Sequence, residues 1–308
     1  MRDIGRELGC SRTAVANAVL RLGRQAMAMH LDLIAGLECS GRLSFDGLVS
    51  AVCSRDYQAQ INTLADSETE MLLLLTHCVT HRGGTFTARQ RRRIEERRSV
   101  WQPSTGSLTA SISQLINELP RFSRDSRLHI DTDEHPLYRR LIDSDLALRW
   151  FDRANLLSVR RTPGSAARTV ENPLFLMNYI DRMIRHRMTE HTRESIALAR
   201  NSTMQMHRMW IFAWDHNARQ PLRVANPQSR SRAQNAGISE SRLTRMHRQF
   251  FSRRHSLRGL VVPRPIRSVW TASLPTPPVR WTGPHKRRRP VVPAYALLDL
   301  SLARPHAP

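Results

Sequence analysis

Three aspartates have the sequence settings that best suit chemistry. Asp46 interrupts an alternating apolar run over residues 43–52, Asp133 follows the apolar run 126–132, and Asp181 lies in a segment with helical periodicity. Carboxylates from separate elements that converge on one spot bind hard divalent cations, and two such cations stabilise the attacking and leaving oxygens of a phosphoryl transfer. We therefore take all three as candidate catalytic residues and metal ligands, and we expect Mg²⁺ or Mn²⁺ as cofactor.

Each of these aspartates also has a purely structural interpretation. The Asp-Gly dipeptide at Asp46 is typical of a hairpin turn, although the apolar run continues beyond it. Asp133 suits a turn or a helix cap ahead of Pro136. Asp181 suits an ion pair with Arg185, which follows it by one helical turn.

Helical geometry favours Asp181 as the third acid. It shares one helical stripe with the apolar residues Met177, Ile184 and Met188. An unpaired carboxylate on such an inward stripe is costly unless a cation or hydrogen-bond donors meet it. Glu190 lies roughly 180° round the helix from Asp181 if the helix is continuous. Asp181 is therefore preferred, and Glu190 and Glu194 stay open as alternatives.

The charge balance points to a polyanionic partner. The 308 residues include 48 Lys and Arg against 26 Asp and Glu, a formal net charge of +22. Such a charge favours nucleic acid, because each phosphate contact releases condensed counterions. The sequence has no run of apolar residues long enough for a membrane helix and no signal-peptide pattern at its start, and its four cysteines stand singly. We expect reduced thiols, a cytoplasmic location and no membrane association.

Residues 1–36 indicate a helix-turn-helix DNA-binding segment. Gly9 suits a helix stop and Ser11 suits the cap of a second helix. That second helix is expected to direct five polar residues outward to DNA: Arg12, Thr13, Asn17, Arg21 and Arg24. A short helical hairpin with no role in DNA binding is the alternative. No helix precedes this pair, so we expect a module truncated at its N-terminus.

The remainder divides into a central domain, 37–218, and a basic Pro/Arg-rich C-terminal region, 219–308. Most of the 17 prolines lie from Pro263 onward, which predicts an extended arm without a packed core. In the central domain, a strongly basic helix over residues 87–101 carries Arg91 and Arg92, which we expect to contact the DNA backbone.

The pattern of the central domain predicts an α/β fold with a mixed sheet and flanking helices. Strands are expected at 43–52, 57–65, 71–79, 126–132 and 155–160. Helices are expected at 87–101, 108–119 and 136–148, followed by a long helical stretch, perhaps with breaks, over 173–217.

Several runs in this domain resemble bacterial insertion-sequence transposases of the DDE type. The clearest are DEHPLYR at 133–139, RTP at 161–163 and NPLFLMNYIDR at 172–182. The similarity extends to FDG at 45–47, EHTRES at 190–195 and ARN at 199–201. The set is specific when taken together. Leu176 and Met177 depart from it, because the family usually has Pro-Val there.

The resemblance implies an RNase H-like catalytic domain. Asp46 on the first strand and Asp133 just after the fourth match the first two acids of the family, and we align the third to Asp181. It also implies a bacterial, nucleoid-associated protein that acts as a homo-oligomer on double-stranded DNA, both element ends and target.

The resulting expectation is a transposase that cleaves the ends of its element and joins the freed 3′-hydroxyl to target DNA by two-metal phosphoryl transfer. One alternative is a non-catalytic helix-turn-helix DNA-binding regulator or an inactive transposase remnant. Another is a nuclease of the same fold that hydrolyses DNA without joining it.

Overall fold

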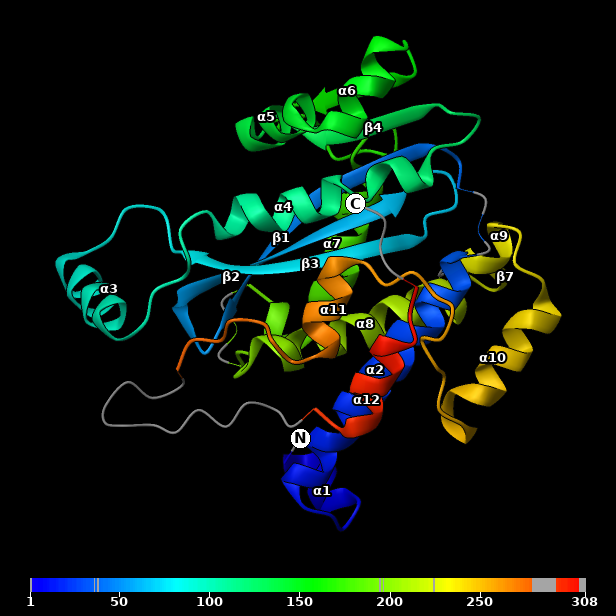
Figure 1. Cartoon of the computed structure of the whole chain (residues 1–308). Helices are drawn as coiled ribbons and strands as arrows, with labels where there is room; N and C mark the ends of the chain where they lie inside the picture. The colour runs from blue at the N-terminus through cyan, green and yellow to red at the C-terminus, as the bar shows by residue number, and fades with distance from the viewer. Residues whose placement is uncertain are drawn as a thin grey trace. The chain divides into compact units, whose positions relative to one another are not determined.

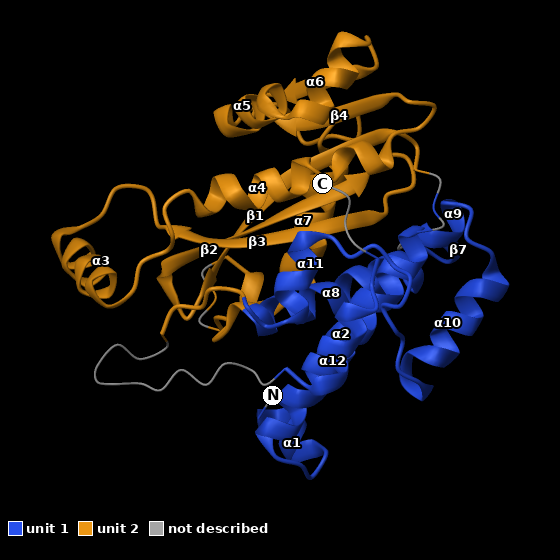
Figure 2. Cartoon of the chain, in the orientation of Figure 1, with its two compact units in different colours: residues 1–37, 203–273, 292–308 blue, residues 38–202, 274–291 orange. Residues whose placement is uncertain are grey.

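The chain forms two compact units in a computed structural model (Figure 2). The structure describes residues 2–35, 37, 39–193, 195, 197–223, 225–278 and 292–304. Unit 1 combines residues 1–37, 203–273 and 292–308, and unit 2 combines residues 38–202 and 274–291. The N-terminal segment thus belongs to the same unit as most of the C-terminal region.

Unit 2 is built on a mixed five-stranded sheet (Figure 1). Its strands are β1 (Arg42–Val52), β2 (Ser54–Asp66), β3 (Leu72–His81), β4 (Leu128–Asp133) and β5 (Leu157–Thr162), in the order β3-β2-β1-β4-β5. β1 pairs antiparallel with β2 and parallel with β4. β3 adds antiparallel to β2, and β5 adds parallel to β4. All five strands predicted from the sequence are confirmed, and the fold class is α/β.

Helices flank this sheet. They are α3 (Ala88–Val100), α4 (Ser107–Ile116), α5 (Pro136–Ser144), α6 (Leu146–Arg153) and α7 (Phe175–Arg187), with the 3₁₀ turns η1 (Leu119–Phe122) and η2 (Thr189–His191). The single helix expected at 136–148 is two helices, because Asp145 has an extended backbone and its Oδ1 accepts a hydrogen bond from the Leu148 amide at 2.9 Å. That bond caps a new helix.

The two faces of the sheet contact different helices. Asn62, which lies opposite Gly47 on β1, donates a hydrogen bond to Ser111 Oγ in α4 at 2.9 Å. Ser50 lies 2.9 Å from His191 Nδ1 in η2. Because side chains alternate along a strand, the odd-numbered residues of β1 face α4 and the even-numbered residues, Asp46 included, face the opposite side.

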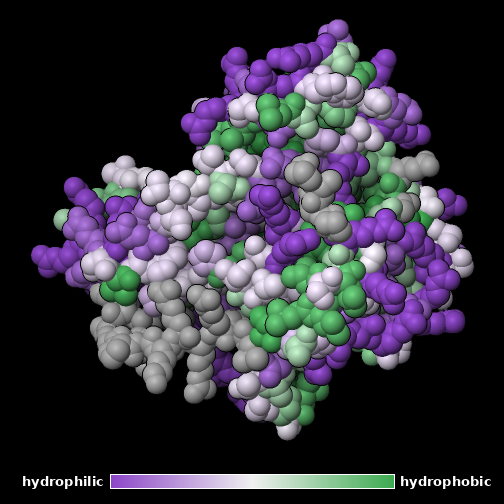
Figure 3. Space-filling view, viewed as in Figure 1, coloured by the Kyte–Doolittle hydropathy of each residue, from purple (hydrophilic) through white to green (hydrophobic). Residues whose placement is uncertain are grey.

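The basic helix α3 is fixed to the sheet by a buried carboxylate. Asp56 on β2 accepts two hydrogen bonds from Arg93, at 2.9 and 3.0 Å, and forms an ion pair with Arg97 at 3.1 Å. Arg91 and Arg92 remain exposed on the same helix. In the space-filling view, hydrophilic side chains accordingly dominate the surface over α3 (Figure 3).

Unit 1 is mainly helical. It contains α1 (Arg2–Glu7), α2 (Arg12–Ala35), α8 (Ser202–Ala218), α9 (Arg232–Asn235), α10 (Glu240–Ser252), α11 (Arg264–Trp270) and α12 (Ala294–Ser301), with a hairpin of β6 (Pro221–Arg223) and β7 (Asn226–Ser231). Between α1 and α2, Gly9 has φ +60° and Ser11 Oγ accepts from the Ala14 amide at 3.1 Å. The expected helix stop and cap are therefore present.

The C-terminal part of unit 1 differs from the extended arm expected from its composition. Ile266 and Trp270 in α11 are fully buried, and Trp270 Nε1 donates to the Ala296 carbonyl at 2.7 Å. Pro263 and Pro265 stand at the start of α11, where proline favours a helix because the missing amide has no partner there anyway. The prolines therefore begin a packed helix.

Helix α12 exposes apolar side chains on its outer surface. Leu297 and Leu298 are 53% and 61% exposed. Hydrophobic residues gather over α12 in Figure 3. Within the described ranges, no helix combines the length and the apolar character that crossing a membrane requires.

Candidate active site

Two of the predicted acids lie side by side on the central strands. The parallel register of β1 and β4 pairs Ser44 with Asp131. Two residues further along each strand, on the same face, come Asp46 and Asp133. Helix α7, which carries Asp181, contacts β1 and β2. The sheet and one helix thus supply all three predicted carboxylates to one region.

The charges of the three carboxylates are near enough to influence one another through Asp46. Burial, helped by the nearby charge of Asp133 and opposed by the hydrogen bond from Gly47, raises the pKa of Asp46 to about 6. Burial and then repulsion from Asp46 raise the pKa of Asp181 to about 7. The buried phenol of Tyr138 on α5 has its pKa raised by burial and then by each of the three carboxylates. The ring of Tyr138 packs edge-on against Phe45, an odd-numbered residue of β1, so it lies on the α4 face of the sheet and senses the acids from the other side of β1.

Among the three candidate acids, Asp181 has the fewest hydrogen-bond donors from the described residues. The Gly47 amide donates to Asp46 Oδ1 at 2.6 Å, and the His135 amide donates to Asp133 Oδ1 at 2.9 Å. Asp181 Oδ2 lies 3.8 Å from Arg185. Asp181 Oδ1 is buried and has no hydrogen-bond partner among the described residues. Such an oxygen is costly unless a cation or donor meets it.

The donor set suits a hard divalent cation. Carboxylate oxygens are the ligands that Mg²⁺ and Mn²⁺ prefer, and the unmatched Asp181 Oδ1 is an oxygen that a cation would satisfy. Among the described residues, no group of three or more His, Cys, Asp or Glu is close enough to hold a metal ion without adjustment.

A fourth aspartate on the same sheet face has a structural role. Asp131 is buried two residues before Asp133, and its Oδ1 accepts a hydrogen bond from Arg160 Nε at 2.7 Å. Arg42 lies 3.5 Å from its other oxygen, and His129 also contacts it. Because its charge is balanced by these neighbours, Asp131 stabilises the pairing of β1, β4 and β5.

Glu190 lies in a different position from the one expected. The helical stretch is broken at Met188, which has φ −123°, so Glu190 falls in η2. The helix is therefore not continuous through Glu190, so the condition for placing Glu190 on the face opposite Asp181 is not met. Glu190 Oε1 lies 3.5 Å from His191 Nε2. Glu194, the other alternative, lies outside the described residues.

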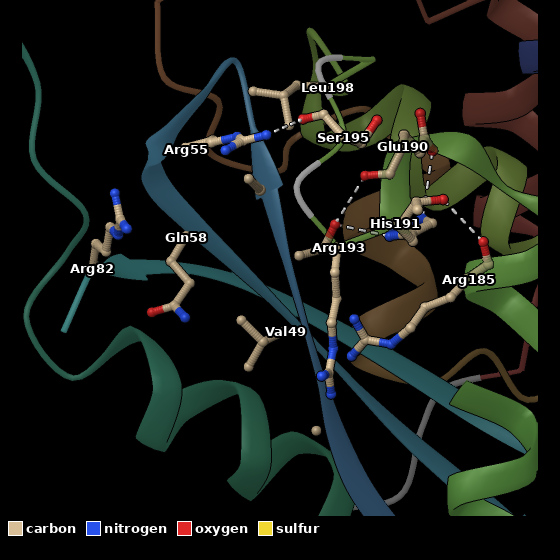
Figure 4. Close-up of a pocket in the computed structure, with 14 residues that line it drawn as sticks. Val49, Arg55, Gln58, Arg82, Arg185, Glu190, His191, Arg193, Ser195 and Leu198 are labelled. Atoms are coloured by element: carbon tan, nitrogen blue, oxygen red, sulfur yellow. Dashed lines mark hydrogen bonds and ion pairs between the residues drawn. The ribbon is translucent and has the colours of Figure 1, made fainter. Parts of the chain in front are cut away.

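A basic pocket of about 460 Å³ adjoins this region (Figure 4). Its cationic lining residues are Arg55, Arg82, Arg185 and Arg193. Arg185 also forms the ion pair with Asp181, and both Arg185 and Arg193 attract the Asp181 carboxylate. Figure 4 shows the side chains of these two arginines directed to the same part of the pocket. Paired guanidinium groups beside the candidate acids suit a phosphodiester backbone.

The residues expected to contact DNA are exposed with one exception. Those exposed on α2 are Arg12, Thr13, Asn17 and Arg21, and those exposed on α3 are Arg91 and Arg92. The expectation that Arg24 points outward is wrong, because its exposed fraction is 3% and its Nε donates to the Trp270 carbonyl at 3.1 Å. The second half of α2 is enclosed by unit 1, so helix periodicity alone misplaced this residue.

Two residues that interact electrostatically with the candidate acids were not recognised from the sequence. Tyr138 lies within the run DEHPLYR, where its position after a proline-initiated helix start was the available signal. Arg168 attracts both Asp46 and Asp181 from an irregular segment before α7. No periodicity identifies a residue in such a segment.

Comparison of the chain with models of protein families gives no match. Comparison with curated proteins also finds no relative. The functional argument therefore depends on the geometry of the site and on the sequence resemblance described above.

Proposed function

We propose that this protein is a DNA transposase of the DDE type, which cleaves element ends and joins the 3′-hydroxyl to target DNA. The observation that carries the proposal is the convergence of Asp46, Asp133 and Asp181 from β1, β4 and α7, with one buried carboxylate oxygen lacking a donor. Clustered carboxylates of this kind are suited to two-metal phosphoryl transfer.

The topology supports an RNase H-like assignment of unit 2. The resemblance implies a first acid on the first strand and a second acid just after the fourth. Asp46 lies within β1, and Asp133 is the last residue of β4. The sheet order, with β1 between β2 and β4, sets these two acids on adjacent strands.

Each group has a distinct role in this proposal. Asp46, Asp133 and Asp181 hold Mg²⁺ or Mn²⁺, which supplies a nucleophile and neutralises charge that develops on the phosphate. Arg185 and Arg193 bind the phosphodiester in the adjoining basic pocket. The exposed polar residues of α2 and α3 add contacts to double-stranded DNA.

The decisive experiment is a strand-transfer assay with the full chain, a labelled element end and a target plasmid. Asp46→Asn, Asp133→Asn and Asp181→Asn should each lower divalent-metal-dependent cleavage and joining by several orders of magnitude while DNA binding is retained. Asp143→Asn is the matched control, because Asp143 is 61% exposed on α5. Binding without cleavage in the parent protein would indicate a regulator or an inactive remnant, and cleavage without joining a nuclease.

A thermal-shift measurement tests metal binding without relying on activity. Mn²⁺ should raise the Tm of the parent protein, because it binds the folded acid cluster and relieves the repulsion between Asp46 and Asp181. The shift should be lost in Asp181→Asn and kept in Asp143→Asn. An equal shift in both variants would place the metal elsewhere.

A further inference from the structure

A second basic pocket lies in unit 1, outside the acid cluster. Its volume is about 470 Å³, within the range of about 300–1,000 Å³ that is typical of small-molecule sites. Helix α2 lines one part of it, and residues 250–255, Trp270 and Tyr295 line the rest. The pocket is therefore assembled from four separate segments of the chain.

A buried arginine with an unsatisfied nitrogen lines this pocket. Arg24 is 3% exposed, its Nε is bonded to the Trp270 carbonyl, and its Nη2 has no hydrogen-bond partner among the described residues. Burial lowers the pKa of Arg24, and its interaction with Tyr295, a phenol rather than a carboxylate, offsets that shift only in part. A buried guanidinium without an acidic partner is costly, and an anion in the pocket would offset that cost.

The other charges on the pocket have the same sign. Arg21, Arg253 and Arg254 line it together with His255, and its described lining includes no carboxylate. Arg253 and Arg254 are exposed, so their guanidinium groups are available to a ligand. This distribution excludes a cationic ligand and favours an anion with several acceptor oxygens, as in a phosphate.

Aromatic side chains accompany these cations. Phe251 is 76% exposed, which is unusual for a large apolar residue, and it lies against the ring of Phe250. Arg254 is stacked on Tyr295, with Cζ 3.6 Å from the ring centroid. Exposed aromatic rings beside arginines are the combination that holds a nucleobase by stacking while its phosphate is bound.

We propose that this pocket binds a nucleotide of an unpaired nucleic-acid strand, with its phosphate at Arg24 and Arg254 and its base against Phe251. The site is independent of the acid cluster. It would give unit 1 a contact with single-stranded nucleic acid in addition to the double-stranded contacts expected of the exposed face of α2.

The test uses a 5′-phosphorylated DNA tetranucleotide, too short to reach several sites, and inorganic phosphate as a second probe. Binding to the full chain is measured by calorimetry. Arg254→Ala should weaken binding of both probes at least about tenfold, and Phe251→Ala should weaken only the tetranucleotide to a similar degree. Both side chains are exposed, so these variants should fold.

Three controls make the result specific. Arg258→Ala removes an exposed arginine of the same segment that does not line the pocket, and it should change affinity less than about twofold. Asp181→Asn should bind the tetranucleotide as the parent does, which separates this site from the proposed active site. Arg24→Met should abolish phosphate binding, and its Tm is compared with that of the parent to show that the variant is folded.

Three outcomes would overturn the proposal. Equal losses in Arg254→Ala and Arg258→Ala would show a diffuse effect of positive charge. Phosphate binding that depends on Arg254, with no effect of Phe251→Ala on the tetranucleotide, would show a simple anion site. Tighter binding of a glutamate-rich peptide through the same residues would show an acidic-peptide site.

Discussion

At the scale of single residues, neighbours decide which ionisable groups are available for chemistry. Asp131 and Asp133 lie two positions apart on one strand face, yet only Asp131 is bonded to Arg160. Asp181 has a buried oxygen that no described residue reaches with a hydrogen bond, whereas the side chain of Asp143 is largely exposed. The candidate acids thus differ from other aspartates in their surroundings. The amino-acid sequence does not show this difference, because all of these residues are aspartates.

His207 provides a pH-dependence prediction at this scale. Burial, and then repulsion from Arg24, lower the pKa of His207 to about 3. In the unfolded chain, the pKa of this histidine has its usual value of about 6.5. Below about pH 6.5 the unfolded chain therefore binds a proton that the folded protein does not, so the free energy of unfolding falls as the pH decreases toward 3. Between pH 6.5 and 5, this single group should cost about 2 kcal/mol.

The measurement compares denaturation of the parent, His207→Gln and His186→Gln at pH 7 and pH 5. His207→Gln should lose less stability on acidification than the parent. The slope of its free energy of unfolding against pH should be smaller by the amount that uptake of about one proton produces. His186 is exposed, so His186→Gln should follow the parent. Parallel curves for the parent and His207→Gln would contradict the prediction.

At the scale of elements, close packing determines what a helix is able to do. The second half of α2 is buried in unit 1 while its first half is exposed, so one helix combines a packed end with a polar surface. Gly23 stands where the two halves meet. A Cβ at Gly23 would come within 2.6 Å of the Cβ of His207 on α8.

Gly23→Ala should therefore destabilise unit 1 despite the better helix propensity of alanine. Overpacking costs about 1–3 kcal/mol, against roughly 1 kcal/mol gained from propensity. Thermal or chemical unfolding measures the balance, and we expect a net loss of about 1–2 kcal/mol. Gly83→Ala is the control, because a Cβ there has no atom within 4 Å. A stabilised Gly23→Ala would show that α2 and α8 have room to separate.

At the scale of the whole molecule, chain segments that are distant in sequence pack together to form one unit. Unit 1 draws on the N-terminus, the region after α7 and the last described helix. Besides the bond from Trp270 to Ala296, the Arg304 amide donates to the Leu260 carbonyl at 2.8 Å. The last segment of the chain is thus part of the core of unit 1.

Deleting residues 292–308 should consequently lower the Tm of unit 1. The deletion leaves the buried Trp270 indole without its acceptor, which alone costs about 1–3 kcal/mol. Calorimetry of the truncated chain checks this, with Leu298→Ser in the full chain as control because Leu298 is 61% exposed. An unchanged Tm after truncation would restore the extended arm suggested by composition.

The strand pattern could be predicted from the sequence, and the reason is local. Runs such as residues 43–52 and 71–79 have an apolar content and length that suit only a strand in this context, so strand positions agree with the structure. Helix breaks at Asp145 and Met188 were harder, because they depend on one backbone conformation each. The position of Glu190 relative to Asp181 depended on whether such a break was present.

The sequence by itself determined the positive charge, the order of strands and helices along the chain, and Asp46, Asp133 and Asp181 as candidate acids. Only the tertiary structure decided that β1, β4 and α7 bring these acids to one region, that Arg24 is buried, and that the Pro-rich region contains a packed helix. The spacing of apolar residues along a segment indicates which side of a helix or strand is apolar. They do not record which distant segment covers it, because that depends on how all the elements pack together.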